Sequence, residues 1–136
     1  MNDLTFVLRA VDLLASYGIR TWVAGGWGEE LRGLAAPRPH GDVDLLYPGP
    51  RWERVDALDL DWIRGKRLPW KRAFVLDETM VELLLVELEE GEWVTRLPGR
   101  THRWPPNVFA AGGRLPVASA AALAGYRAAY ASRRAA

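Results

Sequence analysis

The most informative part of the sequence is Gly25-Gly26-Trp27, followed by Asp42-Val43-Asp44-Leu45-Leu46. Side chains on a strand alternate between faces, so Asp42 and Asp44 point the same way, and the apolar residues between and beyond them are typical of a strand. Two carboxylates on one face repel each other unless a cation lies between them, and oxygen ligands favour Mg²⁺ that carries phosphates. The two glycines predict bare backbone at the start of a helix, where N–H groups bind anions. Together the motifs predict phosphoryl or nucleotidyl transfer.

The order of the elements strengthens this interpretation. An apolar run over residues 21–24 precedes the glycines, a helical stretch from Gly28 to Leu34 follows them, and a proline-bearing loop leads to the acidic strand. Either motif alone has a structural explanation, because a glycine pair is usually a turn and an Asp-x-Asp pair is often a solvated strand end or a cap. In this order they predict a phosphate-binding turn and a metal-binding pair in one site.

This order resembles the minimal nucleotidyltransferases of the DNA polymerase β superfamily. The closer resemblance is to the small aminoglycoside nucleotidyltransferases of the 2″-adenylyltransferase type, in which Gly-Gly-Trp is followed by Arg-x-His and then Asp-x-Asp. This chain has Arg38-Pro39-His40 just before its acidic pair. The stretch 42–49 and the segment Tyr126-Arg127-Ala128-Ala129-Tyr130 continue the resemblance.

The resemblance implies roles for single residues. Asp42 and Asp44 are expected to bind the metal, and the residues expected to bind the nucleotide are Gly25, Gly26, Trp27, Arg38, His40 and Arg127. An arginine can fork onto phosphate oxygens, and an imidazole can hydrogen-bond a carboxylate or a phosphate. The alternatives are a loop histidine without a function for His40 and a solvated helix face for Arg127. Gly41 departs from the family, because close relatives carry another acid at that position.

A third carboxylate is expected on a neighbouring strand, as a metal ligand or as the base that accepts the hydroxyl proton. Glu82 fits best because it is an isolated acid in an apolar strand, where a buried charge without a cation is costly. The family usually has Asp here, so Glu82 leaves open whether this residue is base or ligand. The rival is Glu87, whose odd separation from Glu82 places it on the opposite face. The alternative for Glu82 is a solvated residue of an edge strand.

Hydrophobic periodicity predicts an α/β (α+β) fold, with a mixed central β-sheet and helices packed mainly on one face. The resemblance implies that this is the nucleotidyltransferase fold. The acidic strand is expected near the centre of the sheet. A first helix is expected to begin after Asn2 or Asp3, either of which can cap it, and to end before Gly18. Further helices are expected over 26–34, 52–58 and 119–132. The expected strands are 19–24, which is also predicted to be central, 42–47, 62–68, 72–76, 79–88, 92–96 and 115–117, with a loop or short helical excursion over 98–113.

Other polar and aromatic residues have weaker signals. The region around His102 and Trp104 is a candidate wall of an acceptor or base pocket, whereas Trp70-Lys71-Arg72 is expected on the surface of a hairpin. The chain contains seven tryptophans, and packing is favoured for them over stacking on a base, with Trp27 and Trp104 left open.

Composition bounds the class of protein. The 136 residues are expected to form a single nucleotidyltransferase-like domain, 1–136, closed by a C-terminal helix over 118–132. The net charge of +1 lacks the basic excess of a general nucleic-acid binder, so nucleic acid is not an expected partner. No stretch is apolar for long enough to predict a membrane span. The absence of Cys fits a cytoplasmic protein without disulfides or thiolate metal sites.

The function predicted first is a transfer that depends on Mg²⁺, or on Mn²⁺, and moves AMP from ATP, or another nucleotide from its triphosphate, onto a hydroxyl of a small acceptor. The resemblance implies an aminoglycoside-like acceptor. Because little chain follows the final helix, a homodimer partner is one source for the rest of the acceptor wall. Two alternatives remain open: an antitoxin-type nucleotidyltransferase that AMPylates a HEPN-type protein partner, and a degenerate relative that only binds nucleotide.

Overall fold

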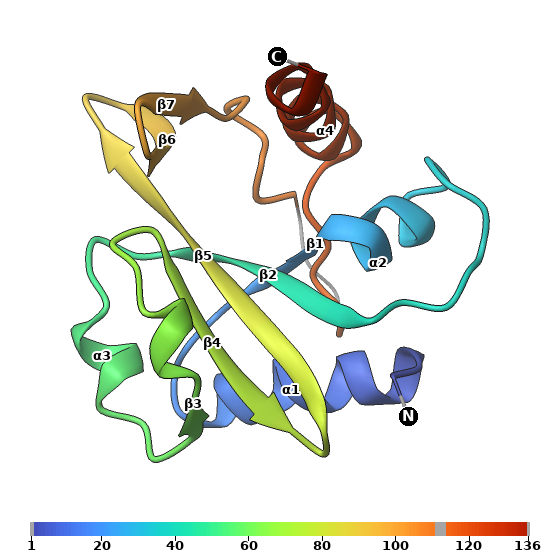
Figure 1. Ribbon diagram of the computed structural model, residues 1–136, viewed down its shortest axis with the longest axis vertical. Coiled ribbons are helices and arrows are strands. Elements are labelled where there is room, and N and C mark those ends of the chain that lie inside the picture. The colour runs from blue at the N-terminus through green and yellow to red at the C-terminus, as the bar shows by residue number, and fades with distance from the viewer. Residues whose placement is uncertain (1, 111–113, 136) are drawn as a thin grey trace.

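A mixed sheet runs through the middle of the protein in the computed structural model, which describes residues 2–110 and 114–135 (Figure 1). Within these residues its strands follow the order β1-β2-β5-β4-β3, and β6 and β7 continue from the far end of β5. Their bounds are β1 Trp22–Ala24, β2 Asp42–Pro48, β3 Asp61–Trp62, β4 Lys71–Leu76, β5 Thr79–Glu89, β6 Glu92–Leu97 and β7 Arg100–Arg103. The strands β2 and β5 are parallel and the other pairs are antiparallel. The predicted α/β class and mixed sheet are confirmed.

The strand β5 forms the axis of the sheet because both of its edges are paired. Its residues from Met80 to Val86 pair with β2 on one side, its first half pairs with β4 on the other, and its last residues pair with β6. Burial alternates with a period of two from Thr79 to Leu85, as expected for a strand whose two faces meet different surroundings. Asp77 and Glu78 form the tight turn between β4 and β5, with φ of 46° and 64°.

Two helices cover one face of the sheet. The helix α1 (Leu4–Ser16) is capped by Asp3, whose side chain accepts a hydrogen bond from the backbone N–H of Phe6 at 2.9 Å. The short helix α3 (Glu53–Asp56) packs into the same hydrophobic cluster through Val55. Gly18, with φ of 79°, ends the turn after α1, as its position after the apolar pattern predicts.

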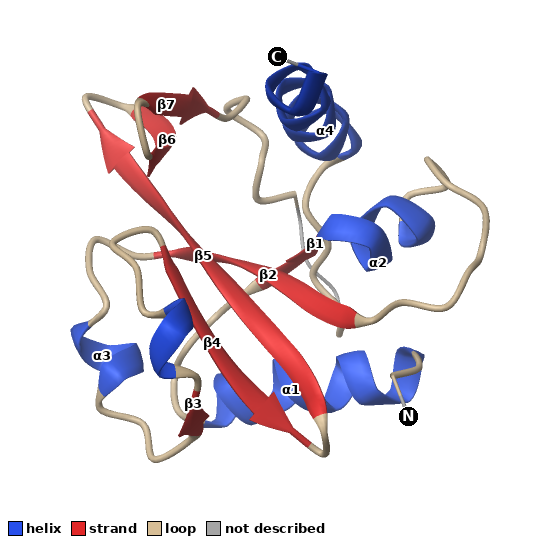
Figure 2. Cartoon of the chain, viewed as in Figure 1, coloured by secondary structure: helices blue, strands red, loops and turns tan. Residues whose placement is uncertain are grey.

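The remaining helices flank the polar side of β2 (Figure 2). The helix α2 (Gly25–Leu31) follows β1 directly, and α4 (Ala120–Ala135) begins after Ser119, whose hydroxyl accepts from the backbone N–H of Ala122 at 3.1 Å. Contacts join α2 to α4, to β1 and to β2. Among the described residues no helix is both long and apolar enough to cross a membrane.

Two hydrophobic clusters lie on opposite faces of the sheet. The larger joins α1 to the faces of β2 and β5 that carry Val43, Leu45, Val81 and Leu83. The smaller lies on the other face, where Trp22, Leu46 and Val86 meet α4 and Trp104. The second face is therefore apolar only towards the β6–β7 end, and its other part is free to carry acids.

Two predicted segments are wrong in type. Of the predicted strand 62–68 only Trp62 lies in a strand, β3, and Leu68 forms an isolated bridge to Lys71. A 3-10 turn, η1 (Arg64–Lys66), lies between them, because Gly65 and its charged neighbours give no apolar face to bury. The predicted loop 98–113 contains β7. Pro98 and Gly99 form the turn of a hairpin, with φ of 71° at Gly99, where the sequence suggested an end to regular structure.

The predicted strand 19–24 is shorter than expected and is not central. The strand β1 begins at Trp22 and lies at one end of the strand order, and its only further partner among the described residues is an isolated bridge from Val23 to Val117. That bridge is also all that forms of the predicted strand 115–117. Residues 22–24 are apolar because α1 and the smaller cluster bury them from two sides. Burial on both faces produces the same continuous apolar run as a central position in the sheet, which is why the prediction was wrong.

Candidate active site

Three carboxylates meet on one face of β2 and β5. The parallel register sets Asp44 opposite Glu82, and Asp42 lies two residues earlier on β2, so all three point to the same side. One oxygen from each lies within 4.8 Å of the others. An all-oxygen set of this kind suits a hard divalent cation such as Mg²⁺, so the residues present fit the metal that the sequence predicts.

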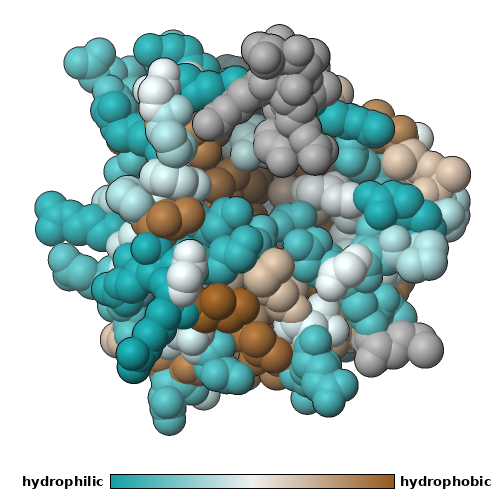
Figure 3. Space-filling view, viewed as in Figure 1, coloured by the Kyte–Doolittle hydropathy of each residue, from teal (hydrophilic) through white to brown (hydrophobic). Residues whose placement is uncertain are grey.

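Small residues flank the acids on both sides. Asp44 and Glu82 lie in one row across the sheet, between Ala24 on β1 and Ala73 on β4. A cavity of about 350 Å³ opens over this row. Figure 3 shows the surface hollowed beside α4, with apolar atoms in the hollow. The cavity is lined by Ala24, Gly25, Glu29, Asp42, Asp44, Leu45, Leu46, Lys71, Glu82, Leu83, Leu84, Trp104, Leu123, Tyr126 and Arg127.

The acid cluster is electrostatically strained. Burial raises the pKa of Asp44 to about 8, and the negative charges of Asp42 and Glu82 act in the same direction. Burial, followed by the charge of Glu82, also raises the pKa of Asp42. Carboxyl groups that resist ionisation at neutral pH are typical of a site completed by a cation, because the cation would remove the repulsion.

Two lysines reach Glu82 from the side opposite Asp44. The Nζ atom of Lys71 lies 3.4 Å from one carboxylate oxygen of Glu82, and that of Lys66 lies 3.5 Å from the other. The expectation that residues 70–72 form a hairpin surface is therefore wrong. Lys71 lines the cavity, and Arg72 is buried on the opposite face, where its guanidinium donates to Asp56 at 2.7 Å.

Gly25 brings the backbone against Asp44. Its φ is 59°, and a Cβ at this position would collide with the Oδ2 atom of Asp44. Only glycine combines this conformation with this approach. Gly25 therefore places the first turn of α2 beside the acid pair.

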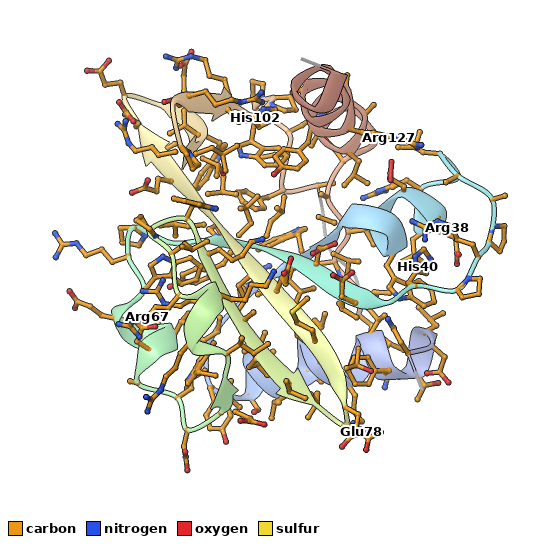
Figure 4. The ribbon with its side chains drawn as sticks, viewed as in Figure 1. Arg38, His40, Arg67, Glu78, His102 and Arg127 are labelled. Atoms are coloured by element: carbon orange, nitrogen blue, oxygen red, sulfur yellow. The ribbon has the colours of Figure 1, made fainter. Side chains whose placement is uncertain are left out.

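Gly26, the second predicted phosphate-binding glycine, faces a different group. A Cβ there would lie 2.6 Å from Arg38 and 2.7 Å from the Nδ1 atom of His40. Arg38 and His40 lie together beside α2 (Figure 4), and the Nε2 atom of His40 is 3.0 Å from a carboxylate oxygen of Glu30. The hydrogen bond from His40 lowers the pKa of Glu30.

The predicted nucleotide-binding residues thus fall into two groups. Gly25 and Arg127 line the cavity, whereas Arg38 and His40 are absent from its lining within the part of the chain that the structure describes. Trp27 is also outside the lining. Its indole is buried against His40 and donates to the side-chain oxygen of Asn2 at 2.9 Å, which makes it part of the core.

Arg127 closes one side of the cavity. It comes from α4 and lies 3.0 Å from a carboxylate oxygen of Glu29 on α2 (Figure 4). Both residues line the cavity, so this ion pair joins the two helices at its rim. The sequence did not predict a role for Glu29, because an acid in a short helix is usually solvated.

An aromatic group forms the wall nearest the β6–β7 hairpin. The rings of Trp104 and Tyr126 stack at 5.1 Å, and the ring of His102 meets both of them edge-on. His102 is buried, and among the described residues its Nε2 atom has no hydrogen-bond partner. Burial lowers the pKa of His102. Trp104 and Tyr126 line the cavity, whereas His102 supports them from outside its lining.

Lys71 could have been found from the sequence. The two-residue turn at Asp77-Glu78 fixes the hairpin register, which places Ala73 opposite Glu82 and Lys71 opposite Leu84. Alternation then puts Lys71 on the face of Glu82. Lys66 had no such signal, because it lies in the 3-10 turn rather than on a strand.

The fold and the carboxylate cluster define the class of protein, a nucleotidyltransferase. A model of the aminoglycoside-2''-adenylyltransferase family matches residues 6–88, from α1 to the end of β5, which include Asp42, Asp44 and Glu82. The match covers more than half of the chain, and the chain belongs to this family. A search of curated proteins found no match.

Solved structures share the fold at low sequence identity. The lincosamide antibiotic adenylyltransferase LnuA, bound to lincomycin, has a TM-score of 0.66 and 16% identity, over 86% of this chain and 80% of that one. ANT(2'')-Ia in complex with adenylyl-2''-tobramycin has a TM-score of 0.63 and 18% identity, over 96% and 75%. A nucleotidyltransferase-type protein of Thermotoga maritima has a TM-score of 0.52 and 19% identity, over 96% and 85%.

Proposed function

We propose that this nucleotidyltransferase moves AMP from ATP onto a hydroxyl group of a small antibiotic-like acceptor, with Mg²⁺ as its metal. Membership of the adenylyltransferase family supports the reaction, and the structural likeness to two antibiotic adenylyltransferases supports the kind of acceptor. The observation that carries the proposal is the cluster of Asp42, Asp44 and Glu82, whose oxygens lie within 4.8 Å of one another.

The reaction breaks a phosphoanhydride bond of ATP and forms a phosphate ester bond to the acceptor. The acceptor oxygen forms a bond to the α-phosphorus, the bond from that phosphorus to the β-phosphate oxygen breaks, and pyrophosphate leaves with the electron pair. The hydroxyl proton passes to a base or to water. A bound Mg²⁺ would supply charge neutralisation for the phosphates.

The chain's own residues would position the reactants. Asp42 and Asp44 would hold the metal, and Gly25 would let the backbone N–H groups at the start of α2 approach the phosphates. Arg127 would exchange its bond to Glu29 for one to a phosphate oxygen. Arg38 and His40 would not contact the nucleotide directly. They would hold the loop between α2 and β2 against Gly26.

Glu82 would receive the hydroxyl proton or complete the metal site. Lys66 and Lys71 flank its carboxylate, which keeps the group in place on the side of the cavity away from Gly25. Lys71 would also face the phosphates, because it lines the cavity together with the acids.

We also propose that residues 1–136 form a single nucleotidyltransferase-like domain. Neither alternative from the sequence gains a supporting observation: none of the relatives named above is a protein-modifying enzyme by its name, and the three acids proposed to act in catalysis lie close together.

Pyrophosphate release tests the function directly. ATP, GTP, CTP and UTP are each incubated with MgCl₂ and a panel of hydroxylated antibiotics, with metal-free and acceptor-free reactions as controls. The expected result is acceptor-dependent release with ATP that stops when EDTA is added. Nucleotide binding without release for any acceptor would favour the degenerate alternative.

A further inference from the structure

A second cavity adjoins the candidate active site. It has a volume of about 190 Å³ and lies between the β4 end of the sheet, the β6–β7 hairpin and α4. It shares Lys71, Leu84 and Tyr126 with the larger cavity, so the two cavities lie side by side with these residues between them. The Nζ atom of Lys71 is 3.4 Å from Glu82, which lines the larger cavity.

The charge of this cavity is positive. Lys71 and Arg100 are its charged lining residues, and within the described parts of the chain no Asp or Glu lines it. Because Lys71 forms an ion pair with Glu82, the positive charge of the cavity rests on Arg100. Arg100 donates a hydrogen bond to the backbone carbonyl of Ala129 at 3.4 Å, and a carbonyl group does not neutralise a guanidinium charge. A ligand with several ammonium groups would therefore meet repulsion here.

The remaining lining is apolar. Trp70, Leu84, Leu97 and Pro98 line it together with the ring of Tyr126. These side chains offer flat and aliphatic surfaces, which suit a ring or a hydrocarbon chain without charge.

We infer that this second cavity binds the acceptor, and that the acceptor is a hydroxylated molecule whose part in the cavity is apolar and either uncharged or anionic, rather than a polyamine. The inference rests on the proposed function and narrows its substrate class. It gives this chain a different acceptor preference from that in the name of its family.

The position of the second cavity favours the acceptor, rather than the nucleotide, as its ligand. Gly25, Glu29 and Asp44 line only the larger cavity, on the side where α2 begins. The second cavity lies on the other side of Lys71, which pairs with Glu82 of the larger cavity. An acceptor held there would have to extend past Lys71 to bring its hydroxyl group to the carboxylate that is proposed to receive the proton.

The first experiment compares two acceptors of different charge. Pyrophosphate release with MgATP is measured with tobramycin, a polyamine, and with lincomycin, which carries a single amine. Isothermal titration of each acceptor, with and without MgATP, accompanies the kinetics. The expected result is a kcat/KM at least about tenfold higher for lincomycin and tighter binding of it.

Two variants locate the preference in the cavity. Arg100→Glu reverses the charge and should shift the ratio of kcat/KM towards tobramycin by about tenfold, with the Kd of MgATP unchanged. Trp70→Ala should raise the KM for lincomycin without lowering kcat. The control is Arg103→Glu, because Arg103 is on the same strand but exposed, pairs with Glu92, and is not in the lining. It should leave the ratio unchanged.

The outcomes separate this inference from the proposed function. Higher activity on tobramycin, or a ratio that Arg100→Glu and Arg103→Glu change equally, overturns the inference and leaves adenylyl transfer intact. Failure of the protein to bind MgATP overturns the proposed function instead. If MgATP binds but neither acceptor does by titration, the cavity is not an acceptor site and the inference fails.

Discussion

The two faces of β2 and β5 carry opposite kinds of side chain on the same backbone. On one face Val43, Leu45, Val81 and Leu83 are fully buried beneath α1. On the other, Asp42, Asp44 and Glu82 crowd their negative charges together. The comparison teaches that the buried face stabilises the sheet while the acidic face opposes folding at neutral pH. The acidic face is therefore the one that a ligand should stabilise.

The largest effect is expected from Asp44→Asn. This change replaces a carboxylate that is proposed to bind the metal. It should abolish Mg²⁺-dependent nucleotide binding, measured by titration with MgATP. The melting temperature of the metal-free protein should stay the same or rise, because the change also removes repulsion. Binding of MgATP as tight as that of the parent would contradict the metal-binding role of the pair.

Glu82→Gln should lower turnover by about two to four orders of magnitude, the usual range for a positioned base, with little change in melting. Its control is Glu87→Gln on the same strand, where Glu87 faces the other way and lies 4.0 Å from Arg96. Turnover of the control should match that of the parent. If the control were inactive and Glu82→Gln active, Glu82 would not be the third acid.

Leu83→Ala probes the apolar face between the same two strands. Leu83 is fully buried, so the change should lower the free energy of unfolding by about 2–5 kcal/mol, measured by urea denaturation. The matched control is Leu88→Ala, since Leu88 is 59% exposed on the same strand and its loss should cost little. Equal losses from the two variants would show that the burial contrast does not govern stability.

Gly25→Ala should weaken MgATP binding, because the new Cβ meets Asp44. Gly33→Ala is the control for backbone strain. Gly33 also has a positive φ, of 73°, but a Cβ there meets nothing within 4 Å. Both variants should melt somewhat earlier than the parent, and only Gly25→Ala should lose nucleotide affinity in titration. Equal affinities would mean that Gly25 serves the turn alone.

The last prediction concerns the pH dependence of stability. The pKa of Asp44 is raised in the folded protein, to about 8 from 3.8, so the folded state favours the protonated form. The stability that this contributes is full below about pH 4 and is lost as the pH rises towards 8. Melting in EDTA from pH 5 to 8 should show this decline, and Asp44→Asn should flatten it. If the melting temperatures of the parent and of Asp44→Asn changed with pH in parallel, the raised pKa of Asp44 would not be the cause of the decline.

The acid positions were predictable because they depend on local rules. Alternation on β2 aligns Asp42 with Asp44, and the apolar neighbours of Glu82 mark it as an acid that needs a cation. The hairpin turn at Asp77-Glu78 also contained the register that brings Lys71 to Glu82. Arg38 and His40 were harder to place, because residues 32–41 form a loop whose path depends on contacts with Glu30 and Gly26.

Spacing along single segments is enough to predict the caps of α1 and α4, the strands β2, β4 and β5, and the face on which each acid lies. Which of these segments meet depends on the folded structure. The parallel register of β2 and β5, the edge position of β1, the Arg127–Glu29 pair and the second cavity all join residues that are far apart in the chain. The reason is that such contacts depend on packing energies summed over the whole protein, which no short stretch of sequence contains.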